Sequence, residues 1–162
     1  MTDSIERVWE IIEKAGVGML TTQFDGGLRA RPLEPRPDRP AGIIRFVTDV
    51  RGAKDDEITA KPDACLIVIE PKDKAYLSIT GRATVIRDSA LAARIWKKTD
   101  DVWWPGGPDD PNVRVLEFHL ARAELWDGPA SSVVAAYEFA KARVTGAKPN
   151  LGENRKLTVD MT

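Results

Sequence analysis

The sequence predicts a mainly β fold in which a six-stranded antiparallel barrel carries helices inserted between its strands. Two observations support this prediction. Short runs rich in β-branched and aromatic residues recur along the chain between turns rich in Gly, Pro and Asp, and the regular βαβ alternation of a parallel sheet is missing. No internal repeat or long linker divides the 162 residues. We therefore expect a single domain over residues 1–162, with residues 131–162 forming a C-terminal helix and tail.

The first part of the chain predicts a helix followed by a hairpin. Asp3 and Glu6 have the spacing of a capping box, and apolar residues recur at helical intervals until Gly16 ends the helix. Residues 17–24 and 28–33 are typical of two antiparallel strands, because the Asp-Gly-Gly turn between them tolerates positive φ. This region should therefore pair two strands early in the chain.

The middle of the chain alternates breakers and strands. Four prolines within residues 32–40 remove backbone donors and predict a loop or an edge strand. Residues 43–48 then form a strand, and residues 55–60 form a short helix that ends before a proline. Residues 64–69 are apolar throughout, which predicts a central strand covered on both faces.

The last part predicts two long strands and two helices. The strand over residues 76–86 should bend at Gly81, and Asp88 should cap a short helix that reaches Trp96. After an ordered loop rich in Trp, Pro and Gly, residues 113–126 return to strand character. A helix from residue 132 to 144 follows, and the tail could add one more edge strand at Leu157 and Val159.

The composition limits the classes of partner. Lys and Arg total 24 against 25 Asp and Glu, so there is no basic field to attract nucleic acid. The polar, amphipathic N-terminus predicts neither a signal peptide nor a membrane helix. The single cysteine, Cys65, excludes an internal disulfide; we interpret it as a structural thiol, with a reactive thiol as the alternative. We therefore expect a cytoplasmic protein with no nucleic-acid and no membrane partner.

One stretch points to an anion site. The apolar run Phe46-Val47-Thr48 ends in a polar loop that carries Arg51 and Lys54 just before the predicted short helix. A strand, a loop with cations and a helix N-terminus together offer positive charge and backbone N–H groups, which suits a phosphomonoester. The alternative is that both cations are ordinary solvated loop residues.

Other candidates carry weaker signals. Arg29 and Arg31 share one strand face and form either a solvated edge or a second anion clamp. The indoles of Trp96, Trp103 and Trp104 serve either core packing or an interface or ligand role. One histidine and one cysteine are too few for a typical metal-ligand set. The sequence also contains neither a dinucleotide-binding fingerprint nor the motif of a catalytic nucleophile. We therefore assign no catalytic residue and expect no metal.

In combination, these motifs resemble the flavin-binding split β-barrel proteins related to pyridoxamine 5′-phosphate oxidase, in the branch of the general stress proteins. The resemblance covers nearly the whole chain. The segments that carry it are Met19-Leu20-Thr21-Thr22, Arg29-Ala30-Arg31-Pro32-Leu33, Phe46-Val47-Thr48-Asp49 with Lys54 and Glu57-Ile58, Lys61-Pro62, residues 76–83, Asp88, residues 104–111, Trp126-Asp127-Gly128-Pro129 and Val144-Thr145-Gly146-Ala147. It implies an FMN-binding type of split β-barrel.

The resemblance also implies a homodimer with FMN at the subunit interface, FAD or the deazaflavin F420 being the alternative cofactors. The residues implied for the flavin are Arg31, Pro32 and Leu33 along the isoalloxazine ring, Phe46, Val47 and Thr48 along the ribityl chain, and Lys54 at the phosphate. Trp104 would come from the partner subunit. The implied function is that of an oxidoreductase or general stress protein; the alternatives are a flavin-storage protein without turnover and an F420-dependent reductase.

Two departures from the family pattern concern affinity and substrate. The oxidases place a hydroxyl and an arginine before the phosphate lysine, whereas this chain has Gly52 and Ala53, so Arg51 or Arg29 would have to substitute. The arginine and histidine that hold pyridoxamine phosphate near the C-terminus of the oxidases have no counterpart around Arg155 and Lys156. We therefore expect no pyridoxamine phosphate oxidation.

Overall fold

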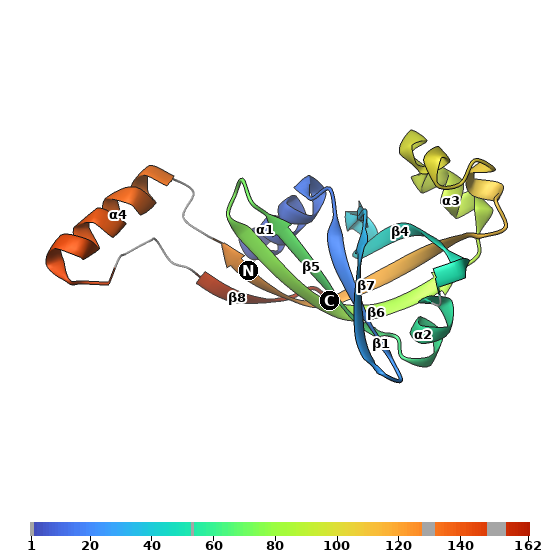
Figure 1. The fold of residues 1–162 in the computed structure, drawn as a ribbon, viewed down its shortest axis with the longest axis horizontal. Helices are drawn as coiled ribbons and strands as arrows, with labels where there is room; N and C mark the ends of the chain where they lie inside the picture. The colour runs from blue at the N-terminus through green and yellow to red at the C-terminus, as the bar shows by residue number, and fades with distance from the viewer. Residues whose placement is uncertain (1, 53, 128–131, 149–154) are drawn as a thin grey trace.

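The computed structural model describes residues 2–52, 54–127, 132–148 and 155–162, and it has one antiparallel sheet as its centre (Figure 1). Eight strands form the sheet: β1 (Gly18–Phe24), β2 (Gly27–Leu33), β3 (Arg36–Asp38), β4 (Ile43–Asp49), β5 (Asp63–Glu70), β6 (Ala75–Ile86), β7 (Val113–Asp127) and β8 (Arg155–Asp160). The helices are α1 (Thr2–Lys14), α2 (Lys54–Ala60), α3 (Ser89–Ile95) and α4 (Ser132–Thr145). The mainly β prediction with inserted helices is thus confirmed.

The predicted number of six strands is wrong, because two short strands join the sheet at its margins. The strand order is β2-β1-β5-β6-β7-β4-β3, with β8 paired to β7 beside this path. β3 lies in the proline-rich segment and pairs with β4 as the last strand of the path, where a proline without an N–H group is tolerated. β8 is the additional edge strand predicted around Leu157 and Val159.

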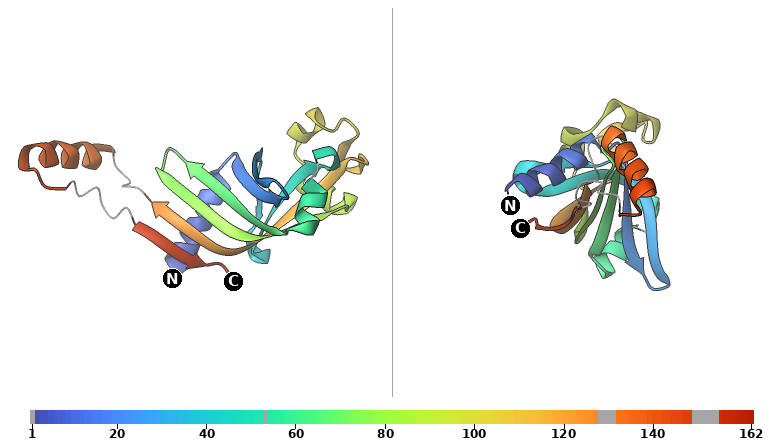
Figure 2. Two further views of the ribbon diagram at one scale, coloured as in Figure 1. Left: turned by 60° about the horizontal axis from the view of Figure 1, so that its bottom comes forward. Right: turned by 90° about the vertical axis from the view of Figure 1, so that its left-hand side faces the viewer.

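The two longest strands, β6 and β7, bend together and curl the sheet (Figure 2). Their register shifts between Thr80 and Gly81, which confirms the bulge predicted at Gly81. A Cβ atom at this position would lie 2.1 Å from the carbonyl oxygen of His119, so only glycine fits without backbone movement. The bend therefore depends on a close approach of two backbones.

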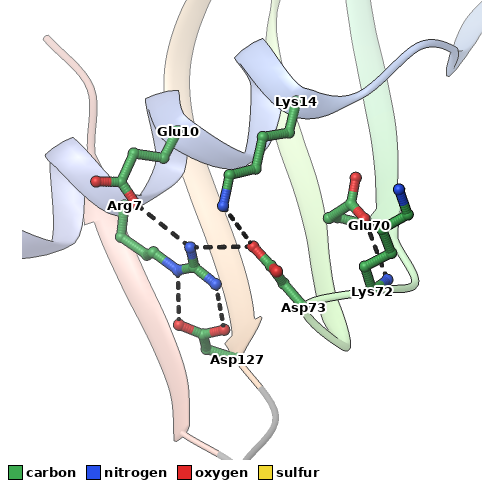
Figure 3. A network of polar contacts seen from close by, with 7 residues as sticks. All are labelled: Arg7, Glu10, Lys14, Glu70, Lys72, Asp73 and Asp127. Carbon is green, nitrogen blue, oxygen red and sulfur yellow. Dashed lines mark hydrogen bonds and ion pairs between the residues drawn. The ribbon is translucent and has the colours of Figure 1, made fainter. Parts of the chain in front are cut away.

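The helix α1 fills the open side of the curled sheet with its apolar face. Val8, Ile11 and Ile12 are fully buried and join the main core, while the opposite helix face carries charge. At its polar edge, Arg7 donates two hydrogen bonds to Asp127 at the end of β7, at 2.9 and 3.1 Å (Figure 3). These contacts fix the helix against the strand ends.

A smaller core cluster lies where α3 packs on the outer side of β4 and β7. It contains Val47, Leu91, Ala92, Trp104, Val113 and Val115. The carboxylate of Asp88 accepts a hydrogen bond from the Leu91 N–H at 2.9 Å, so the predicted helix cap is confirmed. The helix ends at Ile95, one residue before the predicted end at Trp96.

The strand β5 differs from its prediction on one face. Its residues alternate between buried and exposed, and Ile67 and Ile69 are 40% and 55% exposed. β5 is central in the sheet, as predicted, but within one chain only its inner face is covered.

The helix α4 stands apart from the sheet (Figures 1 and 2). In the described part of the chain, no helix combines the length and the hydropathy needed to cross a membrane.

Candidate functional site

The edge strand β2 brings two arginines to the inner face of the sheet. In the hairpin register, Arg29 lies opposite Thr22 and Arg31 lies opposite Leu20, and both of these β1 residues are buried. Because cross-strand partners share a face, both side chains lie on the inner face of the sheet, although that of Arg29 is 46% exposed. This alternation makes Arg31 mostly buried, with its side chain 14% exposed.

One carboxylate, that of Glu57 on α2, binds both arginines. The Glu57 Oε2 atom accepts hydrogen bonds from the Arg31 guanidinium at 2.9 Å and from the Thr22 hydroxyl at 3.3 Å. Its Oε1 atom accepts from Arg29, whose guanidinium also lies 4.6 Å above the centre of the Phe24 ring. The two guanidinium groups and one carboxylate leave a net positive charge at the inner edge of β2.

The protonation of Glu57 follows from these contacts. Burial raises the pKa of Glu57, but the hydrogen bond from Arg31 and the charges of Arg31 and Arg29 outweigh it and lower the pKa below its usual value. Glu57 is therefore ionised at neutral pH. Arg29 and Arg31 thus both bind an internal carboxylate, while the role of the pair as an anion clamp stays a prediction.

The strand β4 carries the second group of predicted flavin residues. Phe46 and Thr48 are 1% and 2% exposed, and Phe46 belongs to the main core. Val47, between them, faces the other way and packs in the cluster beneath α3. The structure therefore does not put these three residues on one face: Phe46 and Thr48 share the inner face of the strand, and Val47 lies on the outer face.

Two of the predicted flavin residues have buried polar atoms without a hydrogen-bond partner. They are the Nη1 atom of Arg31 and the hydroxyl oxygen of Thr48. In the described part of the chain, only one other buried side-chain nitrogen or oxygen is in this state, the Nε atom of Arg36. Buried polar groups are usually hydrogen-bonded, so unpaired ones indicate positions where a polar ligand group is expected.

The loop after β4 holds the predicted phosphate residues. Arg51, whose side chain is 66% exposed, donates from its backbone N–H and its Nε to the Asp49 carboxylate, at 2.7 and 2.8 Å. The hydrogen bond from Arg51 lowers the pKa of Asp49 well below its usual value, although burial acts in the opposite direction. Ala53 and the side chain of Lys54 lie outside the described part of the chain, so the assignment of Lys54 to the phosphate stays a prediction.

The three indoles have different environments. Trp104 is buried in the cluster beneath α3, packs at 6.0 Å between ring centres against Trp96, and donates its N–H to Asp49 at 3.0 Å. Trp103 is 74% exposed. Of the neighbouring pair, Trp103 is therefore the one whose indole is open to solvent. The assignment of Trp104 to a partner's flavin stays a prediction.

The remaining site predictions concern β2 itself. Leu33 points inward and packs against the main core, whereas Pro32 is exposed on the opposite face of the strand. The sequence did not predict Glu57 and Thr22 as residues of the site. The available signal was weak: two arginines at period two predict a nearby acid, but only the packing of α2 on β1 selects Glu57.

Other chemistry-bearing residues do not join this cluster. His119 has a 56% exposed side chain on β7, so it lies at the surface rather than in the core. Cys65 is half-buried, with its Sγ atom 3.5 Å from the Ser78 hydroxyl, and it lines a cavity of about 520 Å³ on the outer sheet face. No group of three or more His, Cys, Asp or Glu residues suited to a metal ion occurs among the described residues.

Comparison with known proteins gives a family and a set of related structures. The sequence matches the family described as Pyridoxamine 5'-phosphate oxidase like over residues 3–150. A protein named for general stress protein 26 from Jannaschia sp. CCS1 has 29% identity and a TM-score of 0.79, over 99% of this chain and 99% of that chain. A protein related to general stress protein 26, from Clostridium acetobutylicum, has 14% identity and a TM-score of 0.73, over 99% of this chain and 96% of that chain.

A further structure is the general stress FMN/FAD binding protein of Xanthomonas citri. It has 24% identity and a TM-score of 0.70, over 82% of this chain and 92% of that chain. No curated protein gives a match. The family match and these folds confirm the resemblance drawn from the sequence motifs and the split-barrel fold class.

Proposed function

Because the chain belongs to the pyridoxamine 5′-phosphate oxidase-like family, we propose that it binds FMN and uses it as an oxidoreductase of the general stress protein branch. The observation that carries this proposal is the pair of unpaired buried polar atoms, Arg31 Nη1 and Thr48 Oγ1. Both belong to residues that the family resemblance implies for the flavin. A flavin has ring carbonyls, ring nitrogens and ribityl hydroxyls that would satisfy a guanidinium donor and a hydroxyl.

The ring end of the site would be made by β2. Leu33 supplies an apolar wall on the inner face, and Arg31 supplies a donor held in position by Glu57. Flavin chemistry is the transfer of electrons or hydride through the isoalloxazine ring, which the cofactor supplies itself. The protein's part is to hold the ring, donate hydrogen bonds to it and keep water from it.

The phosphate end would be made by the loop after β4. Lys54 would bind the phosphate, and Arg51 would add a smaller contribution because Asp49 already binds its guanidinium. The net positive charge of Arg29, Arg31 and Glu57 also favours an anion nearby. FAD shares the FMN half and stays an alternative, as does F420.

We also propose that the protein is a cytoplasmic homodimer with the flavin at the subunit interface. The outer face of β1, β5 and β6 supports this, because its exposed apolar residues lie side by side in register. Met19 pairs with Ile67, and Ile69 pairs with Tyr76, and all four side chains are exposed. A contiguous apolar face of this kind is typical of a protein interface.

Binding and turnover test the proposal separately. Purified protein should quench FMN fluorescence with saturation and turn yellow when loaded. A nicotinamide donor should then bleach the bound flavin, and air should restore its colour. Absence of FMN binding would refute the assignment of FMN. Binding of F420 in its place would favour the F420 alternative. Binding without any reduction would favour the storage protein over the oxidoreductase.

The phosphate assignment has a sharper test in Lys54→Ala. One hydrogen bond to a charged group contributes about 1.5–3 kcal/mol, so FMN should bind roughly ten- to hundredfold more weakly. Riboflavin, which lacks the phosphate, should bind almost unchanged. Lys61→Ala is the matched control, because Lys61 lies just beyond the same helix and pairs with Asp25. Equal losses for FMN and riboflavin would show that Lys54 does not bind the phosphate.

A further inference from the structure

A separate cavity of about 810 Å³ lies between the C-terminal end of α1, the segment around β3 and the end of α3. None of the residues assigned to the flavin lines it. Three prolines, at positions 35, 37 and 40, form part of its wall, and Trp96 provides an aromatic surface. The fixed φ of proline keeps this wall rigid, so the cavity is built from stiff elements.

The wall of the cavity is positively charged, although the whole chain has a net charge of −1. Six cationic side chains line it against three acidic ones, which leaves a formal excess of three positive charges. The cationic residues are Lys14, Arg36, Arg39, Arg45, Arg94 and Lys97, and the acidic residues are Glu13, Glu34 and Asp38. Such an excess in a concave wall concentrates field lines and attracts anions.

The excess arises because several acidic partners lie behind the wall instead of in it. Lys14 donates to Asp73 at 2.8 Å on the side of the β5–β6 turn (Figure 3). Arg45 donates to Glu117 at 2.8 Å, and Arg39 pairs with Glu6. None of these three acids lines the cavity. These acids hold the three cations in place and offset part of their charge.

Arg36 adds an unsatisfied donor to this wall. Its side chain is 8% exposed and donates through Nη2 to both oxygens of Asp100, at 2.8 and 3.1 Å. Its Nε atom is buried without a hydrogen-bond partner. A buried guanidinium of which one nitrogen is unpaired suits an acceptor group of a ligand.

Arg94 is the lining cation that forms no ion pair with a described residue. It is exposed on the last turn of α3 and lines the cavity. The pKa of Asp38 is lowered, first by the hydrogen bond from Arg45 and to a lesser degree by the charge of the nearby Arg94. Its guanidinium is therefore the donor most readily available to a ligand.

We propose that this cavity is a second binding site, for a small molecule that carries at least two negative charges on phosphate or carboxylate groups. Arg94 and Arg36 would donate to its acceptor oxygens, and the lining cations would balance its charge. Trp96 would contact the apolar part of such a molecule. This proposal concerns residues apart from those proposed for the flavin, so the two can fail independently.

The experiment uses the full chain and two probes, sodium pyrophosphate and trisodium citrate, in calorimetric titrations at low ionic strength. Each titration is run with and without saturating FMN. At least one probe should bind saturably, one per chain, with the same affinity in both conditions. Arg94→Gln should weaken that binding about tenfold, as expected for one lost charged contact. Lys98→Gln is the matched control, an exposed neighbouring cation that does not line the cavity, and it should change the affinity less than about twofold.

The results either identify the chemistry of the ligand or show that the cavity is not an anion-binding site. Binding of pyrophosphate alone would indicate phosphate, and binding of citrate alone would indicate carboxylates. The proposal is overturned if neither probe binds saturably, or if both substitutions weaken binding equally, as diffuse charge attraction would require. Loss of probe binding in the FMN-loaded protein would also overturn it, because the anion would then have occupied the flavin phosphate site.

Discussion

Glu57 connects two parts of the chain that the sequence predicts separately, the arginine strand and the loop with the cations. Its carboxylate takes hydrogen bonds from Thr22, Arg29 and Arg31, so it fixes where both guanidinium groups point. A guanidinium held in this way loses little further rotamer freedom when it binds a ligand. The residue thereby orients the donors that the flavin proposal needs.

The lowered pKa of Glu57 gives a prediction with a definite sign. A carboxylate whose pKa is lower in the folded state stabilises the fold above its unfolded pKa, here about 4.5, and loses that effect as the pH falls through the folded value. Glu57→Gln should therefore reduce the free energy of unfolding by about 1.5–3 kcal/mol at pH 7, and the difference should shrink below about pH 4.5. Urea unfolding at pH 7, 4 and 3 measures this difference.

The matched control for this substitution is Asp56→Asn, which removes the same charge from an exposed position on the same helix. It should change stability by less than about 0.5 kcal/mol at every pH. A difference between the wild type and Glu57→Gln that stays constant down to pH 3 would contradict the ionised, arginine-bound state of Glu57.

Local sequence patterns predicted single residues well where the cause is local. The Asp88 cap depends on a side chain and an N–H group three residues apart, and it was predicted correctly. The partnership of Glu57 with Arg31 spans 26 positions and depends on how α2 packs, so no pattern in the sequence selects it.

At the scale of elements, the strands with internal periodicity and clear turn chemistry were predicted, as was the edge strand β8. The proline-rich segment of β3 predicted only a loop or an edge strand. The hairpin of β1 and β2 has the predicted turn, and Gly27 has φ of 137° there. β3 is only three residues long and contains a proline, so its pairing with β4 is a consequence of the neighbouring strand rather than of its own propensity. The wrong count of six strands has this physical cause.

The bulge in β6 supports a prediction about Gly81. Gly81→Ala places a Cβ atom 2.1 Å from a backbone oxygen, which no side-chain movement can relieve. We expect a loss of about 3 kcal/mol in the free energy of unfolding, or failure to fold. Gly16→Ala is the control, because a Cβ atom at this position meets nothing within 4 Å. The free energy of unfolding of this variant should stay within about 1 kcal/mol of the wild type. Equal stability of the two variants in thermal unfolding would show that the bulge does not need glycine.

At the scale of the whole molecule, the described chain leaves apolar surface that a single subunit does not cover. Ile67, Ile69 and Tyr76 are exposed on the outer sheet face, and Tyr137 and Phe139 are exposed on α4. The apolar sequence of β5 predicts that both of its faces are buried, and a single chain covers only the inner face. A second copy of the chain would cover the outer face. The discrepancy on β5 is therefore an argument for assembly, and the dimer should be obligate.

A charge placed on the outer face of the sheet tests whether this face forms the homodimer interface. Ile69→Glu puts a carboxylate where the homodimer would bury an isoleucine, and two-fold symmetry places the change on both sides of the interface. The dimer dissociation constant should rise at least about a hundredfold, giving monomers in light scattering at micromolar concentration. Ala90→Glu, on the exposed side of α3, should leave the dimer intact.

The flavin reports on the same interface independently. If the cofactor lies between subunits, Ile69→Glu should weaken FMN and riboflavin together, because it separates the two halves of the site and removes contacts to the ring. This pattern differs from that of Lys54→Ala, which should weaken FMN alone. A stable monomer of the unmodified chain, or an Ile69→Glu monomer with undiminished flavin affinity, would place the cofactor within one subunit and overturn the interfacial site.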